Sequence, residues 1–513
     1  MLRLKKSISL LLCVMLVVTA SVFIMDGTPS YASEETRGIW LSFTDYSDLG
    51  LKDKTESEFT ASLDTFLDRA AYYGVNTVYF HARAFDDAAW KSETFKASRY
   101  LDSDASANKT AADTYSYDPL TIVIRECHER SMSIEAWLNP YRITYSRFLD
   151  PQAQSSTDRI NRAVDELQNY DLDGIHFDDY YYHSKDSYRT PSEDSKYAVS
   201  VTGTDTSSRP SAANRRTYVN AMVASVYANV HEKTGMKFGI SPAGNVDNCM
   251  SAGADVKTWL SSPGYVDYLA PQIYWTDNWG SSGTTAMFTN RLTQWTSLDL
   301  NGTPMYAGLA LYRAGISSSD DRGWGWSSTN LRTQVSKARA MNCQGYILFT
   351  AKDIFRSSAA TELYKLKGLV DPVTAASISF KYNRRAWVGK SVATSLTWNP
   401  SDTNPKSVKY SSSNTAVATV SSNGRVTGMK PGRVRITATT SNGKTAVMTK
   451  VVKTARVKVI RSRITSRKGP GSRYRKSSRY KRGKILYINR CRGNWGKIRF
   501  TNKWVYLPNT SLY

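Results

Sequence analysis

Cysteine is scarce in this chain of 513 residues, which holds five. Cys13 lies near the N-terminus, whereas Cys127, Cys249, Cys343 and Cys491 are spread at spacings that match neither a zinc motif nor a dense disulfide framework. We expect Cys127 and Cys343 to lie in helices and to pack in the core. A chain without disulfide cross-links relies on large hydrophobic cores, and this length suggests about two or three domains.

Long hydrophobic runs are also missing, except at the start. A basic stretch at residues 3–6 precedes an apolar run over residues 10–18, which continues with interruptions to Met25 and is followed by small residues. This order is typical of a secretory signal peptide, here residues 1–32, cleaved after Ala32. A membrane anchor is the alternative, but the apolar run is shorter than the roughly 18 residues that a span needs. We therefore expect a secreted, cell-wall-associated protein without a transmembrane anchor after cleavage.

Acidic residues are almost absent from the last quarter of the chain. Residues 375–513 hold 31 Lys and Arg against the single acid Asp402, a net charge of +30, whereas the first 374 residues have a net charge of −6. Such a segment attracts polyanions, and composition alone does not choose among them. Because the chain carries a secretory signal, we expect anionic cell-wall polymers rather than nucleic acid as its partners.

From Thr36 to about Leu369, β-rich runs alternate with longer runs of helical periodicity. After the first β-rich run, apolar residues spaced three and four apart indicate one face of an amphipathic helix: Phe59, Leu63, Phe66, Leu67 and Ala70. Eight strands are predicted, at residues 37–43, 77–83, 133–140, 174–180, 237–244, 268–275, 305–313 and 346–353. Alternating strands and helices imply parallel strands with helical crossovers. Residues 33–370 are therefore predicted to form an α/β fold of the (β/α)8 TIM-barrel class.

An open, doubly wound sheet is the alternative fold for this region. It is disfavoured because no glycine-rich phosphate loop follows the first strand. After Pro372 the composition shifts to Ser, Thr, Val, Asn and Gly without helical periodicity, and the pairs Asn423-Gly424 and Asn442-Gly443 are typical of tight hairpin turns. We expect two small all-β domains, a sandwich at 375–453 and a compact barrel at 454–513.

The ten residues DGIHFDDYYY, from Asp173 to Tyr182, are typical of a short strand that ends in two acids. Side chains alternate along a strand, so His176 and Asp178 share one face and Asp179 takes the other. The active sites of TIM-barrel enzymes lie at the C-terminal ends of the strands. The same alternation predicts a ring of inward-facing residues: Ser42, His81, Arg83, Glu135, Asn139, His176, Asp178, Ser241, Gln272, Tyr274, Tyr312 and Lys352. So polar a ring favours an active site over a purely structural polar core.

Carboxyl groups decide the reaction class that this ring supports. We expect Arg83 and His176 to lie near Asp178 and a neighbouring cation to keep it ionised, while a second carboxyl donates a proton, as in glycoside hydrolysis. The candidates for that second group are Asp179, Glu135, Asp87 and Asp277. Metal-dependent chemistry is the rival, but the five histidines include no pair three or four apart on a helix, so we expect no metal and no cofactor. A serine nucleophile motif for acyl transfer is also missing.

Aromatic residues gather after two of the predicted strands, at Tyr180, Tyr181, Tyr182, Tyr274, Trp275 and Trp279. Flat aromatic faces suit the apolar faces of sugar rings, while the polar edges reach hydroxyl groups. Any one of them could be ordinary packing. Their clustering favours a carbohydrate substrate.

Eight motifs follow one another in order: RGIW at Arg37, NTVYFHAR at Asn76, YDPL at Tyr117, AWLNPYR at Ala136, LDGIHFDDYYY at Leu172, FGISP at Phe238, DYLAPQIYW at Asp267 and ALYR at Ala310. By these motifs the stretch resembles the family 10-like glycosyl hydrolases of bacteria. The resemblance implies a TIM-barrel glycosidase that acts on peptidoglycan glycan strands. It places Arg83, Asp87, Asn139, Arg142, Asp178, Asp179, Gln272 and Tyr274 on motif positions, whereas Glu135 stands where the family pattern has His.

The two C-terminal segments carry resemblances of their own. The first, with YSSSNTAVATVSSNGRVTGMKPGRVRITATT at Tyr410, resembles a bacterial Ig-like domain of the type 2 group. The second, with RKGPGSRY at Arg467, GNWGKI at Gly493 and KWVYL at Lys503, resembles a bacterial SH3-type domain. Both resemblances imply attachment of a secreted enzyme to the cell wall.

The sequence therefore predicts a secreted glycoside hydrolase that cleaves cell-wall glycan, the polysaccharide substrate, by a two-carboxylate mechanism. The expected catalytic residues are Asp178, Asp179 and Glu135. The expected substrate-binding residues are Arg83, His81, Asp87, Asn139, Arg142, His176, Gln272, Tyr274, Trp275, Tyr312 and Lys352. Two alternatives stay open, a wall-binding or carbohydrate-binding protein without catalysis and a glycosidase that acts on an exopolysaccharide.

Overall fold

The computed structural model describes residues 35–182, 186–233, 235–298, 300–370, 375–381, 386–401, 403 and 408–512. The predicted signal peptide, residues 1–32, lies outside the described residues. The chain divides into two compact units, one ending at Leu366 and the other beginning at Lys367. Within the described residues, the longest and most apolar helices still fall short of what a membrane crossing requires.

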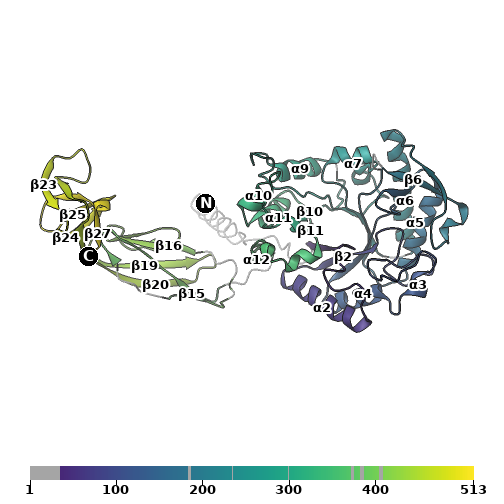
Figure 1. Ribbon diagram of the computed structural model, residues 1–513, viewed down its shortest axis with the longest axis horizontal. Helices are drawn as coiled ribbons and strands as arrows, with labels where there is room; N and C mark the ends of the chain where they lie inside the picture. The colour runs from purple at the N-terminus through teal and green to yellow at the C-terminus, as the bar shows by residue number, and fades with distance from the viewer. Residues whose placement is uncertain are drawn as a thin grey trace, which may run out of the picture. The chain divides into compact units, whose positions relative to one another are not determined.

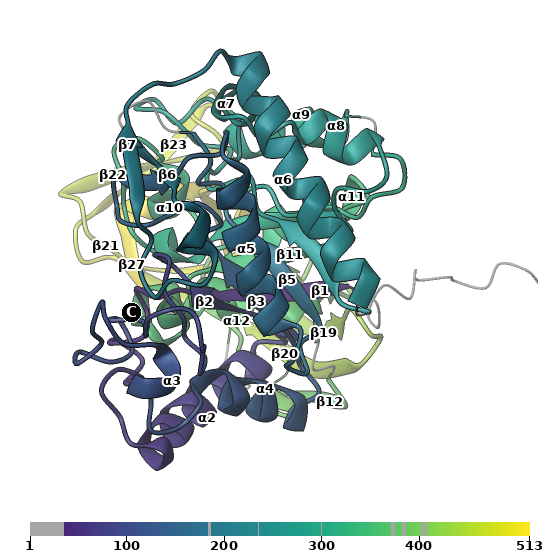
Figure 2. The same cartoon turned by 90° about the vertical axis from the view of Figure 1, so that its right-hand side faces the viewer.

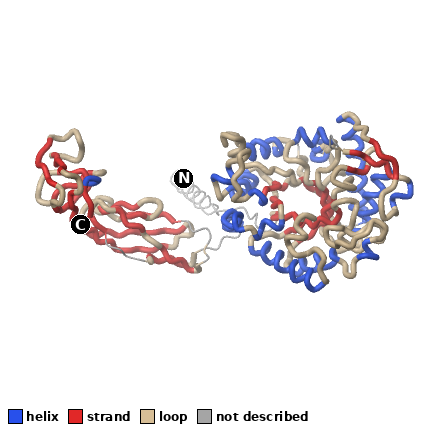
Figure 3. Tube along the Cα trace, viewed as in Figure 1, coloured by secondary structure: helices blue, strands red, loops and turns tan. Residues whose placement is uncertain are grey.

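The first unit is a barrel of eight parallel strands, which confirms the predicted fold. The strands are β1 (Thr36–Leu41), β2 (Thr77–Arg83), β3 (Ser133–Leu138), β5 (Gly174–Phe177), β8 (Lys237–Ile240), β9 (Tyr268–Leu269), β10 (Tyr306–Ala310) and β11 (Gly345–Phe349). They pair in the order β10-β11-β1-β2-β3-β5-β8-β9. Bridges from Leu269 to Met305 and from Gln272 to Gly308 close the ring. Figure 3 shows these strands as a ring inside the helices.

The helices of this unit cover the outside of the barrel (Figure 1). The main ones are α2 (Glu56–Tyr72), α4 (Pro119–Glu129), α5 (Gln154–Leu167), α6 (Ala212–Lys233), α9 (Met287–Thr296), α11 (Asn330–Ala340) and α12 (Ala360–Val370), and the shorter ones are α3 (Ala111–Thr114), α7 (Val246–Ala252), α8 (Val256–Ser261) and α10 (Gly323–Trp326). Helix α2 begins with a capping box between Thr55 and Glu58, and its five predicted apolar positions are all buried. Helices α5 and α6 lie side by side (Figure 2), joined by a hydrogen bond from Asn161 Nδ2 to Ser225 Oγ of 2.9 Å.

Two local features differ from the sequence-based expectation. Cys127 lies in α4 as expected, but Cys343 follows α11, because Asn342 adopts a positive φ of 60° after the helix ends. A small sheet of β4 (Arg147–Leu149), β6 (Ser187–Pro191) and β7 (Gly203–Thr206) was not predicted. All four cysteines of the described residues are buried and free.

After α12, which ends at Val370, the second unit contains only strands and one short 3-10 helix among its described residues. Its first part comprises β12 (Ser377–Phe380), β13 (Ala386–Trp387), β14 (Ser391–Ala393), β15 (Leu396–Asn399), β16 (Val408–Ser412), β17 (Ala418–Val420), β18 (Arg425–Gly428), β19 (Gly432–Thr440) and β20 (Thr445–Lys453). Buried and exposed residues alternate along β20, as on a strand with one face on a core.

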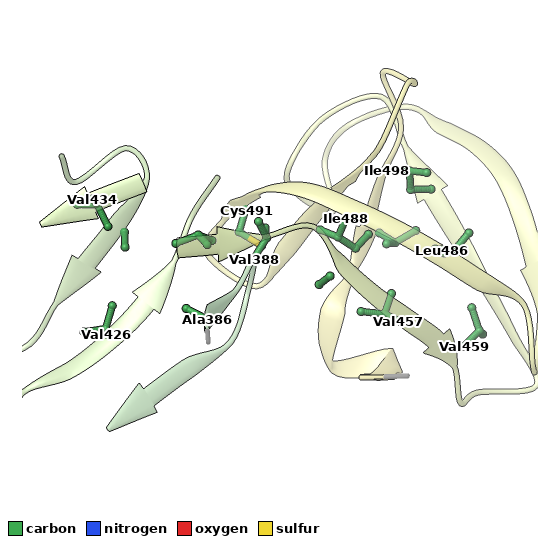
Figure 4. Close-up of a cluster of buried hydrophobic side chains, with 14 of the residues drawn as sticks. Ala386, Val388, Val426, Val434, Val457, Val459, Leu486, Ile488, Cys491 and Ile498 are labelled. Carbon is green, nitrogen blue, oxygen red and sulfur yellow. The ribbon is translucent and has the colours of Figure 1, made fainter. Parts of the chain in front are cut away.

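The second part of this unit is a seven-stranded sheet of β21 (Ala455–Val459), β22 (Arg463–Arg467), β23 (Lys476–Lys481), β24 (Ile485–Arg492), β25 (Trp495–Ile498), β26 (Trp504–Tyr506) and β27 (Thr510–Leu512). Its core is continuous with that of the first part. Val388 and Val434 belong to the same buried cluster as Ile488 and Cys491 (Figure 4). The backbone amide of Cys491 also donates to Met429 O at 2.9 Å, so the two parts pack against each other.

Candidate active site

A cavity of about 390 Å³ opens where the barrel strands end. Its lining residues come from the ends of most of the strands and from the loops that follow them: Trp40, Ser42, Phe43, Thr44, His81, Trp137, Asn139, Arg142, Tyr145, Asp178, Tyr180, Ser241, Gln272, Tyr274 and Phe349. Seven residues of the predicted inward-facing ring are therefore brought together here, at the end of a TIM barrel where catalytic groups lie.

Asp178 follows the last residue of β5 and is 6% exposed. Its Oδ1 accepts hydrogen bonds from Gln272 Nε2 at 3.0 Å and from the backbone amide of Asp179 at 2.8 Å. Burial raises the pKa of Asp178, whereas these hydrogen bonds and the positive charge of Arg142 oppose the rise. The hydrogen bonds favour the ionised carboxylate.

The surroundings of Asp179 favour the protonated carboxyl group instead of the carboxylate. Its side chain is hydrogen bonded to Asp178 and lines an adjoining cavity of about 430 Å³ rather than the first one. Burial, and then the negative charge of Asp178, raise the pKa of Asp179 well above its usual range. Because the pKa of Asp179 is raised further than that of Asp178, Asp179 is the member of the pair that favours the protonated form.

Arg142 supplies the positive charge of the cavity. Its guanidinium carbon lies 4.1 Å from the ring centre of Tyr180, 4.8 Å from that of Phe85 and 5.1 Å from that of Tyr145. Among the described residues no carboxylate lies within ion-pair distance of Arg142, although it is only 7% exposed. A buried guanidinium held against aromatic rings in this way keeps its charge available to the cavity.

His81 and Asn139 complete the polar lining. The His81 ring stacks on Trp137 with ring centres 3.7 Å apart, and burial lowers the pKa of His81 well below its usual value, so the ring is neutral. Asn139 Nδ2 donates to Ala84 O at 3.0 Å, which fixes the orientation of the side chain. Neutral groups of this kind bind hydroxyl or amide groups rather than charges.

Arg83 does not face the cavity, contrary to the expectation that it lies beside Asp178. Its side chain is fully buried and bonds Asp86, Asn139 O and Pro140 O. Arg159 holds the same Asp86 through two bonds of 2.8 and 2.9 Å. Arg83 therefore positions the loop after β2, because its Nη1 and Nη2 atoms donate to groups of the protein.

His176 and Glu135 are also inward, but they lie deeper in the barrel. Trp40 Nε1 donates to His176 Nε2 at 3.1 Å, His176 Nδ1 lies 2.8 Å from Tyr268 Oη, and that hydroxyl donates to Glu135. Burial lowers the pKa of His176 to about 3 and raises that of Glu135 to about 8. Glu135, predicted as a catalytic acid, does not line the cavity, and this chain of buried side chains lies between them.

Four other predicted residues surround the cavity without lining it. Asp87 Oδ1 accepts the backbone amides of Ala84 and Phe85, and Lys352 pairs with Asp48 at 2.8 Å. Tyr312 packs edge-on against Tyr274 and Phe349. Trp275 packs against Gly244 and does not line the cavity. Asp277, considered as a partner acid, pairs with Lys337 and lies outside the cavity lining.

Sequence reasoning missed several groups at the mouth. Trp40, Trp137 and Phe349 line the cavity, yet in the sequence they look like ordinary apolar strand residues. Asp45 is buried after β1, where it accepts hydrogen bonds from Ser42 N at 3.0 Å and from Thr350 Oγ1 at 2.8 Å. Burial raises the pKa of Asp45 to about 6.

Among the described residues, clusters of three or more His, Cys, Asp or Glu suited to a metal ion are not found.

Comparison with known proteins gives the following matches. The family described as glycosyl hydrolase-like 10 matches residues 35–147 and 143–326, and the bacterial Ig-like domain (group 2) matches residues 374–451. The glycosyl hydrolase YngK of Bacillus subtilis is 26% identical over 422 residues, which cover 71% of this chain and 79% of YngK. The glycosyl hydrolase DigH of Escherichia coli is 26% identical over 360 residues, covering 58% of this chain and 78% of DigH. The PgaB glycoside hydrolase domain from Bordetella bronchiseptica has 13% identity and a TM-score of 0.42, covering 64% of this chain and 98% of that domain.

Proposed function

Because the chain belongs to the glycosyl hydrolase-like 10 family and is a glycoside hydrolase, we propose that it is secreted and cleaves cell-wall glycan, with the glycan strands of peptidoglycan as substrate. The observation that carries this proposal is the pair of carboxyl groups at the barrel mouth, Asp178 in one cavity and Asp179 in the next. A glycosidic oxygen that links sugars in the two cavities would lie beside both groups.

The two acids take different roles in this proposal. Asp178 accepts two hydrogen bonds as a carboxylate and either attacks the anomeric carbon or stabilises the oxocarbenium ion. Asp179, whose pKa is raised by burial and by Asp178, donates a proton to the departing glycosidic oxygen. Arg142 balances the negative charge that both carboxyl groups share.

The substrate class is supported by the walls of the cavity and by the second unit. Tyr180 and Tyr274 offer ring surface for sugars, and Asn139 and the Oε1 atom of Gln272 offer polar groups for hydroxyl or acetamido groups. The Ig-like domain and the predicted SH3-like segment, with their charge of +30, would hold the enzyme on anionic wall polymers.

Release of reducing ends from purified peptidoglycan glycan strands tests the proposal. We expect Asp178→Asn to lower the rate by about a hundredfold or more, whereas Asp171→Asn, which removes an exposed acid just before β5, keeps the wild-type rate. If wild type releases no more than Asp178→Asn, the barrel binds glycan without cutting it. Equal or faster cleavage of an exopolysaccharide would contradict the assignment to peptidoglycan.

The pH profile tests the division of roles. We expect the wild-type rate to fall as the pH rises through the elevated pKa of Asp179, because the proton donor is lost. In Asp179→Asn this alkaline fall should disappear, and an aryl glycoside, whose leaving group needs less protonation, should be cleaved better than the natural glycan. An unchanged alkaline limb in Asp179→Asn would contradict its role as the donor.

A further inference from the structure

A third cavity, of about 300 Å³, lies beside the active-site cavity. Its walls include Phe85, Asp87, Lys96, Arg99, Tyr100 and Tyr145. Tyr145 lines both this cavity and the one that holds Asp178. The two spaces therefore adjoin across one side chain, which is the arrangement expected of neighbouring subsites for a polymer.

The wall between the two cavities is aromatic. Phe85 lies 4.9 Å from Tyr145 and 5.5 Å from Tyr100, measured between ring centres, and the hydroxyl groups of Tyr100 and Tyr145 are 3.2 Å apart. Arg142 packs on the faces of Phe85 and Tyr145. Rings that support one another in this way present a fixed surface on which a sugar can stack.

The charges of this cavity are mostly positive, although the barrel region as a whole is acidic. Lys96 and Arg99 line it, and among the described residues neither has a carboxylate within ion-pair distance, although the charge of Lys96 acts on Asp86, which is itself paired with Arg83 and Arg159. Asp87 also lines it, but one of its carboxylate oxygens accepts two backbone amides. Two unpaired cations beside a stacking surface fit a sugar that carries a carboxylate, whereas a neutral sugar would need only the rings and hydrogen-bonding groups.

We propose that this cavity is a subsite for a sugar bearing a carboxylate, in a glycan chain that extends from it past Tyr145 to Asp178. The inference rests on the proposed function for the polymer and deepens it, because it names an acidic glycan as the preferred substrate. The glycan of peptidoglycan from which the peptides have been removed, in which every second sugar carries a free lactyl carboxylate, meets this requirement.

The test compares two soluble probes, oligosaccharides of peptidoglycan glycan stripped of peptides and the same oligosaccharides with their carboxyl groups reduced to alcohols. Binding is measured by calorimetry on the full chain carrying Asp178→Asn, which prevents cleavage. The double variant Lys96→Met/Arg99→Gln is compared with Lys257→Met, which removes an exposed lysine from α8. The basic second unit is present in every protein, so its contribution to carboxylate binding cancels between variants.

We expect the double variant to bind the native oligosaccharide about tenfold more weakly and the reduced one with less than about a twofold change. Equal weakening for both probes, no weakening for either, or no binding of the native probe to the Asp178→Asn protein would overturn the subsite. If the charge-dependent binding is found but wild type does not cleave the native glycan, the proposed hydrolysis fails while the subsite stands. Thermal unfolding of each variant confirms that it is folded.

Discussion

Glu135 is a buried acid whose ionisation should affect folding rather than catalysis. Burial raises its pKa to about 8, whereas the same group in an unfolded chain titrates near 4.5. Between these values the unfolded chain releases the proton and the folded protein keeps it, so the free energy of unfolding falls as the pH rises, by up to about 1.4 kcal/mol per pH unit. Glu135→Gln cannot ionise and should gain stability relative to wild type from pH 5 to pH 8.

Urea unfolding at both pH values checks this expectation. Glu56→Gln, an exposed position in the first turn of α2, serves as the control and should show no such pH-dependent gain. Because Glu135 does not line the cavity, the folded Glu135→Gln protein should keep most of its hydrolytic rate. A loss as large as that of Asp178→Asn would contradict the placement of Glu135 outside the catalytic machinery.

For single residues, the sequence predicts which face of a strand a side chain takes, but not whether that side chain reaches the cavity. Alternation along the strands correctly placed Asp178, His81 and Gln272 on the inner face, where the structure shows them lining the cavity. The same alternation could not show that Glu135 and Arg83 lie away from the cavity, because their positions depend on partners such as Tyr268 and Asp86 that come from distant or irregular segments.

The loop after β2 is fixed to α5 by one buried carboxylate. Asp86 pairs with Arg83 and, through two bonds, with Arg159 of α5. Although burial opposes it, the two guanidinium groups hold the pKa of Asp86 below its usual range. Asp86→Asn would remove the carboxylate that pairs with both buried guanidinium groups, and we expect it to lower the free energy of unfolding of the barrel by about 3–5 kcal/mol.

Asp53→Asn is a matched control for Asp86→Asn, because both aspartates have a positive φ, 54° at Asp53 and 53° at Asp86. Asp53 is exposed, so we expect its substitution to cost less than about 1 kcal/mol. Denaturant unfolding that monitors the barrel measures both. Equal losses in the two variants would mean that backbone conformation, and not the buried charge, determines the effect.

The elements themselves were predictable to different degrees. All eight barrel strands were found from their β-rich composition, but β9 has only two residues because Pro271 lacks the amide hydrogen that would continue the ladder. The sheet of β4, β6 and β7 was missed, since its strands are short and β7 is exposed along most of its length. Regular periodicity predicts long elements better than short ones whose partners lie far along the chain.

At the scale of the whole molecule, charge and structure divide the chain at nearly the same place. The acidic barrel ends at Leu366, and the basic unit begins at Lys367. Sequence composition predicts two small β domains here, and the structure adds that they share a core of residues such as Val388 and Ile488. Composition could not show this, because packing between segments depends on which apolar faces meet.

A protein that lacks residues 375–513 should therefore lose binding to insoluble cell wall while it retains turnover of a short soluble glycan. Residues 454–513 alone hold 18 Lys and Arg and no acid, and attraction of that kind is screened by salt. Sedimentation with purified walls and reducing-end release measure the two properties on the same preparations. The advantage of the full chain in wall binding should shrink between about 0.05 and 0.5 M salt, where the Debye length falls severalfold. An equal loss of binding and turnover on truncation would contradict this separation of roles, and a binding advantage that does not change with salt would exclude electrostatic attachment.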